Sequence, residues 1–406
     1  MRFSFYAVFS IIVLILISVF AGYENPKLVE IPKTKIKYFL KKFGIRDSFI
    51  IDSNQSNIQL KNNTSTKEEI FANSFTLEIE KIKNLKDKKT AGIFFKDDEN
   101  YTIFTQNGEK IIKNDIREIN LPIDFTLEKN GGVKSVIYFD SNYYALLSRK
   151  SLGCNYASLI NLREQLEVFT TKCIPDKSEV DFAGLGGAYT YFEDNLILSI
   201  GTPTHLSEEI NDLAQEDDSL FGKILILSKN SKNKNLLDVS IFSKGHRNPQ
   251  GLVKVNNFIY STEHGPQGGD EINLIQQNQN YGWPVVSLGT RYGGKSYQKS
   301  LKNYQEPIYS FLPAVAPSSL NECPKNLKEF YKKYTCLLGL TLREMSIIVY
   351  LFDKDNRLIS SEKILIEKRL RNFGLNDNSK LFVKDNFFYF SADNDGIYKG
   401  IFQNFR

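Results

Sequence analysis

The residues best suited to bind a small molecule lie in one stretch of the chain, residues 245–284. Arg247 and Asn248 lie near its start, and Gly265 and Pro266 open a glycine-rich segment further on. An arginine guanidinium binds carboxylates through paired hydrogen bonds, and amide and backbone carbonyl oxygens are ligands for Ca²⁺. These residue types therefore suit an anionic ligand together with a hard cation.

Two short strands are predicted between these two groups of residues. Residues 252–255 and 258–261 are rich in β-forming side chains, and the two asparagines between them predict a tight turn. A hairpin returns the chain to the side from which it left. Arg247 and Gly265 should therefore lie at the same end of one sheet.

The same stretch resembles the signature of the soluble quinoprotein glucose/sorbosone dehydrogenases, a family that includes the bacterial aldose sugar dehydrogenases. The matching pieces are residues 245–251, 265–273 and 280–284, with weaker similarity from about residue 90 to the C-terminus. Members of this family are all-β proteins, six-bladed β-propellers that bind pyrroloquinoline quinone (PQQ) and Ca²⁺ on one face and oxidise sugars. The resemblance implies this fold, these cofactors and a small-molecule sugar substrate.

The resemblance also implies roles for individual residues. Gly265 and Pro266 would offer backbone carbonyls to the catalytic Ca²⁺. The cofactor-binding residues would be Arg247, Asn248, Arg369 and Arg371. An Arg-x-Arg alternation places both side chains on one face of a strand, although without the family a solvated strand edge would be the simpler interpretation.

The chain departs from the family pattern where the general base is expected. Family members carry a histidine at this position, which here is Ala183, and alanine cannot accept a proton. His205 follows the same predicted hairpin and is the candidate substitute, with an idle loop histidine as the alternative. Asn130 replaces a glutamine that shapes the substrate pocket. The family's cofactor-binding lysine falls near Thr341, so its charge is lost or shifted to Arg343.

Two functions are therefore compatible with the sequence. The first is an exported PQQ- and Ca²⁺-dependent aldose dehydrogenase, impaired by the loss of the base at Ala183. The alternative is a catalytically inactive β-propeller that binds a glycan or a protein partner. Asp270 and Glu271 form a carboxylate pair, but we expect them to lock the glycine-rich loop by accepting backbone N–H bonds.

The N-terminus predicts export. An apolar run over residues 5–21 follows Met1 and Arg2, which is typical of a signal peptide or of a short membrane anchor. We therefore expect residues 1–22 to be such a segment and the protein to be periplasmic, either soluble or anchored to the inner membrane.

Four cysteines in an exported chain favour disulfides. They allow three pairings. We predict the sequence-local one, Cys154 with Cys173 and Cys323 with Cys336, because each pair could join neighbouring strands or a loop. Four buried free thiols are the alternative, and no cysteine or histidine spacing indicates zinc.

The rest of the chain predicts one large β domain. Pairs of β-rich segments separated by Asp or Asn turns recur after residue 90, as expected for propeller blades. We assign residues 76–406 to the propeller and the Lys- and Asn-rich residues 23–75 to a short polar extension. The net charge of +5 is spread along the chain, so nothing indicates binding to nucleic acid.

Overall fold

The chain divides into two units, Met1–Thr64 and Ser65–Arg406. The structure, a computed structural model, describes residues 67–406 without 205, 234–235, 293–296 and 298–301. The predicted signal or anchor segment, most of the predicted extension and His205 lie outside the described residues. Among the described residues, no helix is long and apolar enough to cross a bilayer.

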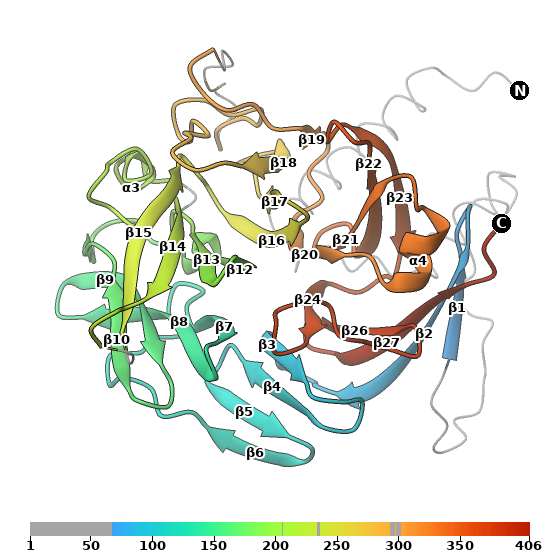
Figure 1. Cartoon of the computed structure of the whole chain (residues 1–406). Coiled ribbons are helices and arrows are strands. Elements are labelled where there is room, and N and C mark those ends of the chain that lie inside the picture. Colours follow the sequence, from blue (N-terminus) through green and yellow to red (C-terminus); the bar gives the residue numbers. More distant parts are fainter. Residues whose placement is uncertain (1–66, 205, 234–235, 293–296, 298–301) are drawn as a thin grey trace, which may run out of the picture. The chain divides into compact units, whose positions relative to one another are not determined.

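The described residues form antiparallel sheets around a common centre (Figure 1). Three sheets have four strands each. Their strands are β12 (Gly186–Phe192), β13 (Asn195–Ile200), β14 (Lys223–Lys229) and β15 (Leu237–Lys244); β16 (Pro249–Val255), β17 (Phe258–Glu263), β18 (Asp270–Ile275) and β19 (Tyr309–Phe311); and β20 (Pro317–Glu322), β21 (Thr335–Thr341), β22 (Ser346–Phe352) and β23 (Leu358–Leu365).

Another sheet has five strands, of which β11 pairs with β9 beside the main path. Its strands are β7 (Val133–Phe139), β8 (Asn142–Ser151), β9 (Cys154–Asn161), β10 (Leu166–Thr170) and β11 (Ile174–Pro175). The helices among the described residues are short, namely the 3₁₀ turn η2 (Phe182–Gly184), α3 (Glu208–Asp212) and α4 (Lys325–Phe330).

The largest sheet has ten strands and two parts. The parts join through a short parallel pairing of Gly374 and Leu375 with Ile93 and Phe94. One part contains β3 (Thr90–Phe95), β4 (Tyr101–Thr105), β5 (Glu109–Ile112) and β6 (Asp115–Glu118). The other contains β1 (Lys67–Phe71), β2 (Thr76–Asn84), β24 (Leu370–Leu375), β25 (Val383–Lys384), β26 (Phe387–Ala392) and β27 (Gly396–Gln403).

The sheets form a closed ring. The innermost strands contact one another in the order β3, β7, β12, β16, β20, β24 and back to β3. Strand β2 pairs with β27 along its length, so a strand from the beginning of the described part completes the sheet that ends the chain. This radial arrangement is the architecture of a β-propeller.

The hydrophobic core lies between neighbouring sheets. Leu146 and Leu159 of one sheet pack with Leu198 and Leu225 of the next, and all four are fully buried. Burial of each such side chain contributes about 1.5–3 kcal/mol. Because a sheet in the ring is covered on both faces, β22 is buried along its whole length, and this explains its continuous apolar sequence.

The predicted hairpins form with small differences. The hairpin at 252–261 is β16 paired with β17. Near the C-terminus β25 and β26 form another hairpin, preceded by an isolated bridge between Leu375 and Leu381. A regular four-stranded sheet begins at Pro317, after the long segment that follows β18. Strand β1 lies within residues 23–75, so the sheet begins earlier than the boundary drawn at 76.

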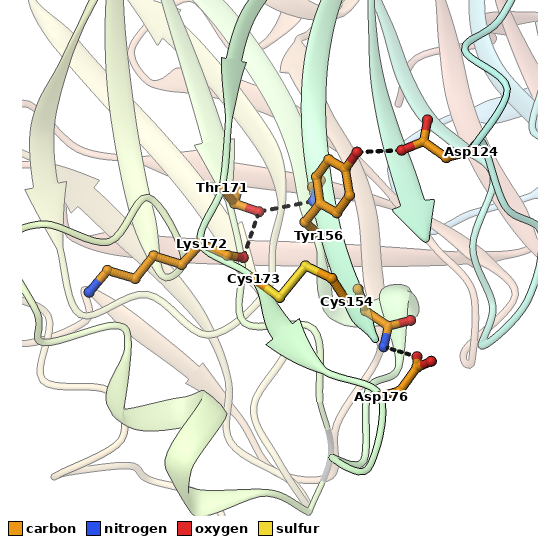
Figure 2. Close-up of a disulfide and its surroundings, with 9 residues drawn as sticks. Asp124, Cys154, Tyr156, Thr171, Lys172, Cys173 and Asp176 are labelled. Atoms are coloured by element: carbon orange, nitrogen blue, oxygen red, sulfur yellow. Dashed lines mark hydrogen bonds between the residues drawn. A yellow bond between two sulfur atoms is a disulfide. The ribbon is translucent and has the colours of Figure 1, made fainter. Parts of the chain in front are cut away.

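Both predicted cysteine pairs are bonded in the structure. Cys154, at the start of β9, joins Cys173, which precedes β11, with a Cα–Cα distance of 5.4 Å (Figure 2). Cys323 joins Cys336 of β21, also with a Cα–Cα distance of 5.4 Å. Each disulfide therefore links segments that are already neighbours in one sheet.

Candidate functional site

A cavity of about 510 Å³ lies where the innermost strands begin. Its lining comes from the first residues of these strands, from the loops just before them and from the turns that follow the second strands of several sheets, so all the sheets contribute. This position explains why residues far apart in sequence meet there. Among the lining residues are Asp87, Lys89, Asn130, Lys134, Asp181, Ala183, Asn248, His264, Arg369 and Arg371.

The structure brings most of the predicted site residues together. Asn130, Ala183, Asn248, Arg369 and Arg371 line the large cavity. Three others, Arg247, Gly265 and Pro266, line a second cavity of about 20 Å³. His264 lines both cavities, so the two groups are neighbours.

Arg247 is buried beside the single tryptophan. Its Nη1 donates a hydrogen bond of 3.1 Å to the His264 carbonyl oxygen, and its guanidinium lies 5.4 Å from the centre of the Trp283 ring. Burial lowers the pKa of Arg247 from its usual value. The Trp283 indole itself donates to Thr202 Oγ1 at 3.2 Å. This tryptophan thus packs against the arginine and fixes it.

Asn248 connects the start of β16 to the loop that contains Ala183. Its Oδ1 accepts from Gly186 N at 3.2 Å and from Gln250 Nε2 at 2.7 Å. Its Nδ2 donates to the Ala183 carbonyl oxygen at 3.4 Å. The amide therefore positions the backbone on both sides of the cavity floor between β12 and β16.

Ala183 is exposed to the cavity in the 3₁₀ turn η2. Its N–H donates to Asp181 Oδ1, which caps this turn at 2.9 Å. The same carboxylate oxygen accepts from Asn130 Nδ2 at 3.1 Å. A methyl group thus occupies the position where the sequence comparison expected a base, and a carboxylate lies two residues away.

Arg369 and Arg371 share one buried carboxylate. Arg371 binds Asp393 through Nε and also through Nη2 at 2.5 Å, and Asp393 is 1 % exposed. The Nε of Arg369 lies 3.8 Å from the same carboxylate, and its side chain is about half exposed. Arg371 is therefore held in place, whereas Arg369 can turn toward a ligand.

The loop around Gly265 and Pro266 is tied down by Asp270. This carboxylate accepts backbone hydrogen bonds from Gly265 N at 2.9 Å, Val315 N at 2.8 Å and Ala316 N at 2.6 Å. Asp270 therefore locks the loop as expected. Its neighbour Glu271 accepts from an asparagine side chain instead, and burial, followed by the nearby Glu263, raises the pKa of Glu271 to about 8.

A metal in this region would depend on main-chain oxygens. Among the described residues, no group of three or more His, Cys, Asp or Glu side chains is placed to hold a metal ion. The Pro266 carbonyl accepts from Tyr292 Oη at 3.0 Å, and a carbonyl oxygen has a second lone pair available. The adjoining cavity of about 20 Å³ has room for one water or one ion.

The two described histidines have partners. His246 is buried between Ser243 Oγ and Glu263 Oε1, both at 2.8 Å. His264 uses Nε2 to donate to the Pro317 carbonyl at 2.6 Å. Burial lowers the pKa of His264, and the nearby charges of Arg247 and Arg371 lower it further against opposing effects of Asp270 and Pro317.

His264 connects the two groups of cations. It lines the small cavity together with Arg247 and the large cavity together with Arg371. The cations that precede β16 and belong to β24 therefore lie at neighbouring cavities. Thr341, near which a cofactor lysine was expected, is buried and donates to the Ser346 carbonyl at 3.0 Å, so it brings no charge to the cavity.

Charged residues that the sequence did not single out also line the large cavity. They are Asp87, Lys89, Lys134 and Asp181. One of them could have been found from the sequence, because Lys134 is the second residue of β7, a mostly apolar strand. With Arg369 and Arg371 included, the described lining carries four cations and two carboxylates, so its charge favours an anion.

A closed ring of β-sheets with a cavity lined by cations defines a β-propeller with a cationic site. The family model for glucose/sorbosone dehydrogenase matches residues 160–389. The match spans more than half of the chain, so the chain belongs to the glucose/sorbosone dehydrogenase family.

Similar proteins extend this assignment. An uncharacterized protein of Synechocystis, slr1608, is 30% identical over 217 residues, which cover 49% of this chain and 52% of that protein. Aldose sugar dehydrogenase YliI of Escherichia coli is 27% identical over 186 residues, covering 42% and 49%. The chain thus spans about half the length of these curated relatives.

Solved structures show the same fold. The soluble aldose sugar dehydrogenase of Escherichia coli in its apo-form matches with a TM-score of 0.63 and 20% identity, over 80% of this chain and 99% of that chain. The PQQ-bound aldose sugar dehydrogenase of Streptomyces coelicolor matches with a TM-score of 0.53 and 15% identity, over 84% and 98%.

Proposed function

We propose that this protein is an exported sugar dehydrogenase that uses PQQ and Ca²⁺. The observation that carries the proposal is the convergence of Asn248, Arg369 and Arg371 on one cationic cavity, with Arg247 at the small cavity that adjoins it. The family assignment and the names of similar proteins, an aldose sugar dehydrogenase and a quinoprotein glucose dehydrogenase, support it.

The propeller would have six blades. If the two parts of the ten-stranded sheet are counted separately, the described residues contain six sheets around the ring. The six contacting innermost strands support the same count. Residues 76–406 would form this propeller, joined by β1 from the preceding segment.

The cavity fits PQQ in size and charge. Sites for ligands of this size measure about 300–1,000 Å³, and the large cavity has about 510 Å³. PQQ is a tricarboxylate, and the half-exposed Arg369 and the fixed Arg371 could bind carboxylates in the paired geometry that guanidinium groups favour. When bound, PQQ supplies the quinone that takes up the electrons of the sugar.

The protein's own residues would hold the ligand and exclude water. Asn248 would keep the cavity floor rigid through its bonds to Gly186 and Ala183. Arg247, locked between Trp283 and the His264 carbonyl, would contribute positive charge behind it. Gly265 and Pro266 would offer carbonyl oxygens to Ca²⁺ beside the small cavity, and Asn130 would contact the substrate.

The removal of the hydroxyl proton is the weak point of this site. Ala183 cannot accept it. His264 donates from Nε2 to Pro317, and burial lowers the pKa of His264, so its imidazole is a weak base. Asp181 lines the cavity next to Ala183, but one of its oxygens already accepts from Ala183 N and Asn130 Nδ2. A positioned general base typically contributes 10²–10⁴-fold, so we propose slow turnover.

The lack of a general base at Ala183 also favours a second function. If no residue takes the proton, the propeller is catalytically inactive and binds a glycan or a protein partner at this face. The N-terminal residues 1–22 would direct either protein to the periplasm, soluble or held at the inner membrane through residues 5–21.

The experiment is reconstitution of the purified protein with PQQ and Ca²⁺, followed by dye reduction with a panel of aldoses. Reduction that requires PQQ, Ca²⁺ and a sugar together is the expected result. PQQ binding without turnover on any sugar would favour the inactive propeller. A protein that neither binds PQQ nor reduces dye would contradict the dehydrogenase proposal.

A further inference from the structure

Lys134 is a charged residue within the ring of innermost strands. It is the second residue of β7, where most of the other positions are buried. It lines the large cavity and also the narrower space between the innermost strands. Its Nζ donates to the Asn130 carbonyl oxygen at 3.0 Å. The hydrogen-bond partner of this ammonium is therefore a neutral oxygen and not a carboxylate.

The surroundings of Lys134 disfavour its charge. Burial is the main cause, Arg371 and Lys89 act in the same direction, and Asp181 opposes them; together they lower the pKa of Lys134 to about 7. Asp87, Arg369 and the His264 side chain line the same cavity. The cavity thus holds a lysine whose described hydrogen-bond partner is neutral and whose nearby cations outweigh the opposing charge of Asp181.

We propose that Lys134 binds an anionic group of the ligand that occupies this cavity. The identity of the ligand rests on the proposed function, in which the group is a carboxylate of PQQ, but the chemistry requires only an anion. Lys134 is partly withdrawn from water, and a cation in such a place is unfavourable unless a partner compensates it. A ligand carboxylate would supply that partner, whereas Thr341 brings no cation to the cavity from β21.

This role makes ligand binding depend on pH. The pKa of Lys134 in the free protein is about 7, and an anion beside the ammonium raises it, so binding above this pH takes up a proton. Affinity should therefore fall by about tenfold between pH 6 and pH 8, because the protonated fraction falls by that factor. Carboxylates remain ionised throughout this range.

The test measures the dissociation constant of PQQ at pH 6 and pH 8 in the presence of Ca²⁺. Quenching of Trp283, the only tryptophan, reports binding because its ring lies beside Arg247 at the adjoining cavity. The proteins compared are the wild type, Lys134→Met and Lys134→Arg. Lys254→Met is the matched control, since Lys254 also lies on an innermost strand but packs on the Phe192 ring.

The inference predicts distinct results for the variants. Lys134→Met should bind PQQ about tenfold more weakly than the wild type at pH 6 and should lose its share of the pH dependence. Lys134→Arg should bind PQQ with similar affinity at pH 6 and pH 8, because arginine remains charged at both. Glu271, whose pKa is raised to about 8, also contributes to the pH dependence of PQQ affinity, and it does so equally in the wild type and in Lys134→Met. The difference in pH dependence between these two proteins therefore reports Lys134 alone.

Two outcomes would overturn the inference. If PQQ binds and Lys134→Met matches the wild type in affinity and pH dependence, Lys134 has no role, although the proposed function survives. If PQQ does not bind the wild type, the proposed function fails, and benzene-1,2,4-tricarboxylate replaces it in a thermal-shift assay. Stabilisation that requires Lys134 would then support the inference, and equal shifts in wild type and Lys134→Met would end it.

Discussion

Asp270→Asn is expected to release one of the two loops beside the small cavity. Asp270 is 2 % exposed, and its two oxygens accept from Gly265 N on one side and from Val315 N and Ala316 N on the other. Asparagine has a single acceptor oxygen. When this oxygen faces Val315 and Ala316, the amide nitrogen faces the Gly265 N–H, which then has no acceptor.

The expected loss of unfolding free energy is about 2–4 kcal/mol. A lost hydrogen bond to a charged group costs about 1.5–3 kcal/mol, and the two remaining bonds weaken because they become neutral. Equilibrium denaturation in urea of the metal-free protein measures this change. The adjacent Glu271→Gln is the informative comparison, because it alters a neighbouring carboxyl group but should act in the opposite direction.

The opposite sign follows from the raised pKa of Glu271. Its folded pKa is about 8, against 4.5 as the reference value, so between these values the folded protein binds more protons than the unfolded chain. Stability from this group is therefore lost as pH rises from about 4.5 to about 8. The glutamine in Glu271→Gln does not titrate. The unfolding free energy of this variant relative to the wild type should therefore rise by up to about 1.4 kcal/mol per pH unit over this range.

The reasoning would be refuted if Asp270→Asn had the stability of the wild type. It would also be refuted if Glu271→Gln lost as much stability as Asp270→Asn at pH 7. Either result would mean that the two carboxylates do not have the separate roles that their hydrogen bonds indicate.

The remaining predictions concern activity, affinity and the disulfide. Ala183→His should raise the dehydrogenase activity of PQQ-loaded protein by about 10²-fold or more, and His205→Ala should leave it unchanged; the reverse pattern would mean that the base is placed wrongly. Arg369→Met should weaken PQQ binding about tenfold with an unchanged urea midpoint, because Arg369 is about half exposed; a lowered midpoint would indicate a structural role. Replacing Cys154 and Cys173 by alanine should cost about 3 kcal/mol in unfolding free energy, and unchanged stability would show that the bond contributes nothing.

Local patterns in the sequence were enough for part of the site. The turn at Asn256 and Asn257 specifies a hairpin, and a hairpin fixes the two segments on either side of it. The proximity of Arg247 and Gly265 at one small cavity follows from this geometry alone. Arg369 and Arg371 are two residues apart at the start of β24. Residues with this spacing in an extended segment lie on the same face, and both arginines line the large cavity.

Contacts that depend on closure of the ring could not be predicted. The charge of Arg371 lowers the pKa of Lys134 because the ring closes through the pairing of β3 with β24. No local sequence pattern predicts that pairing. The burial of Arg247 against Trp283 depends on how residues after β18 fold back. The long segment between β18 and β20 interrupts the regular spacing of the sheets in the sequence, so the regular form of the sheet that begins at Pro317 could not be predicted from that spacing.

A crystal structure of the protein with PQQ and Ca²⁺ would test the central claim most directly. The account predicts PQQ in the cavity of about 510 Å³, with its carboxylates on Arg369 and Arg371 and Ca²⁺ on the carbonyl oxygens of Gly265 and Pro266. Cofactor density elsewhere on the protein, or an empty cavity at saturating PQQ and Ca²⁺, would contradict it.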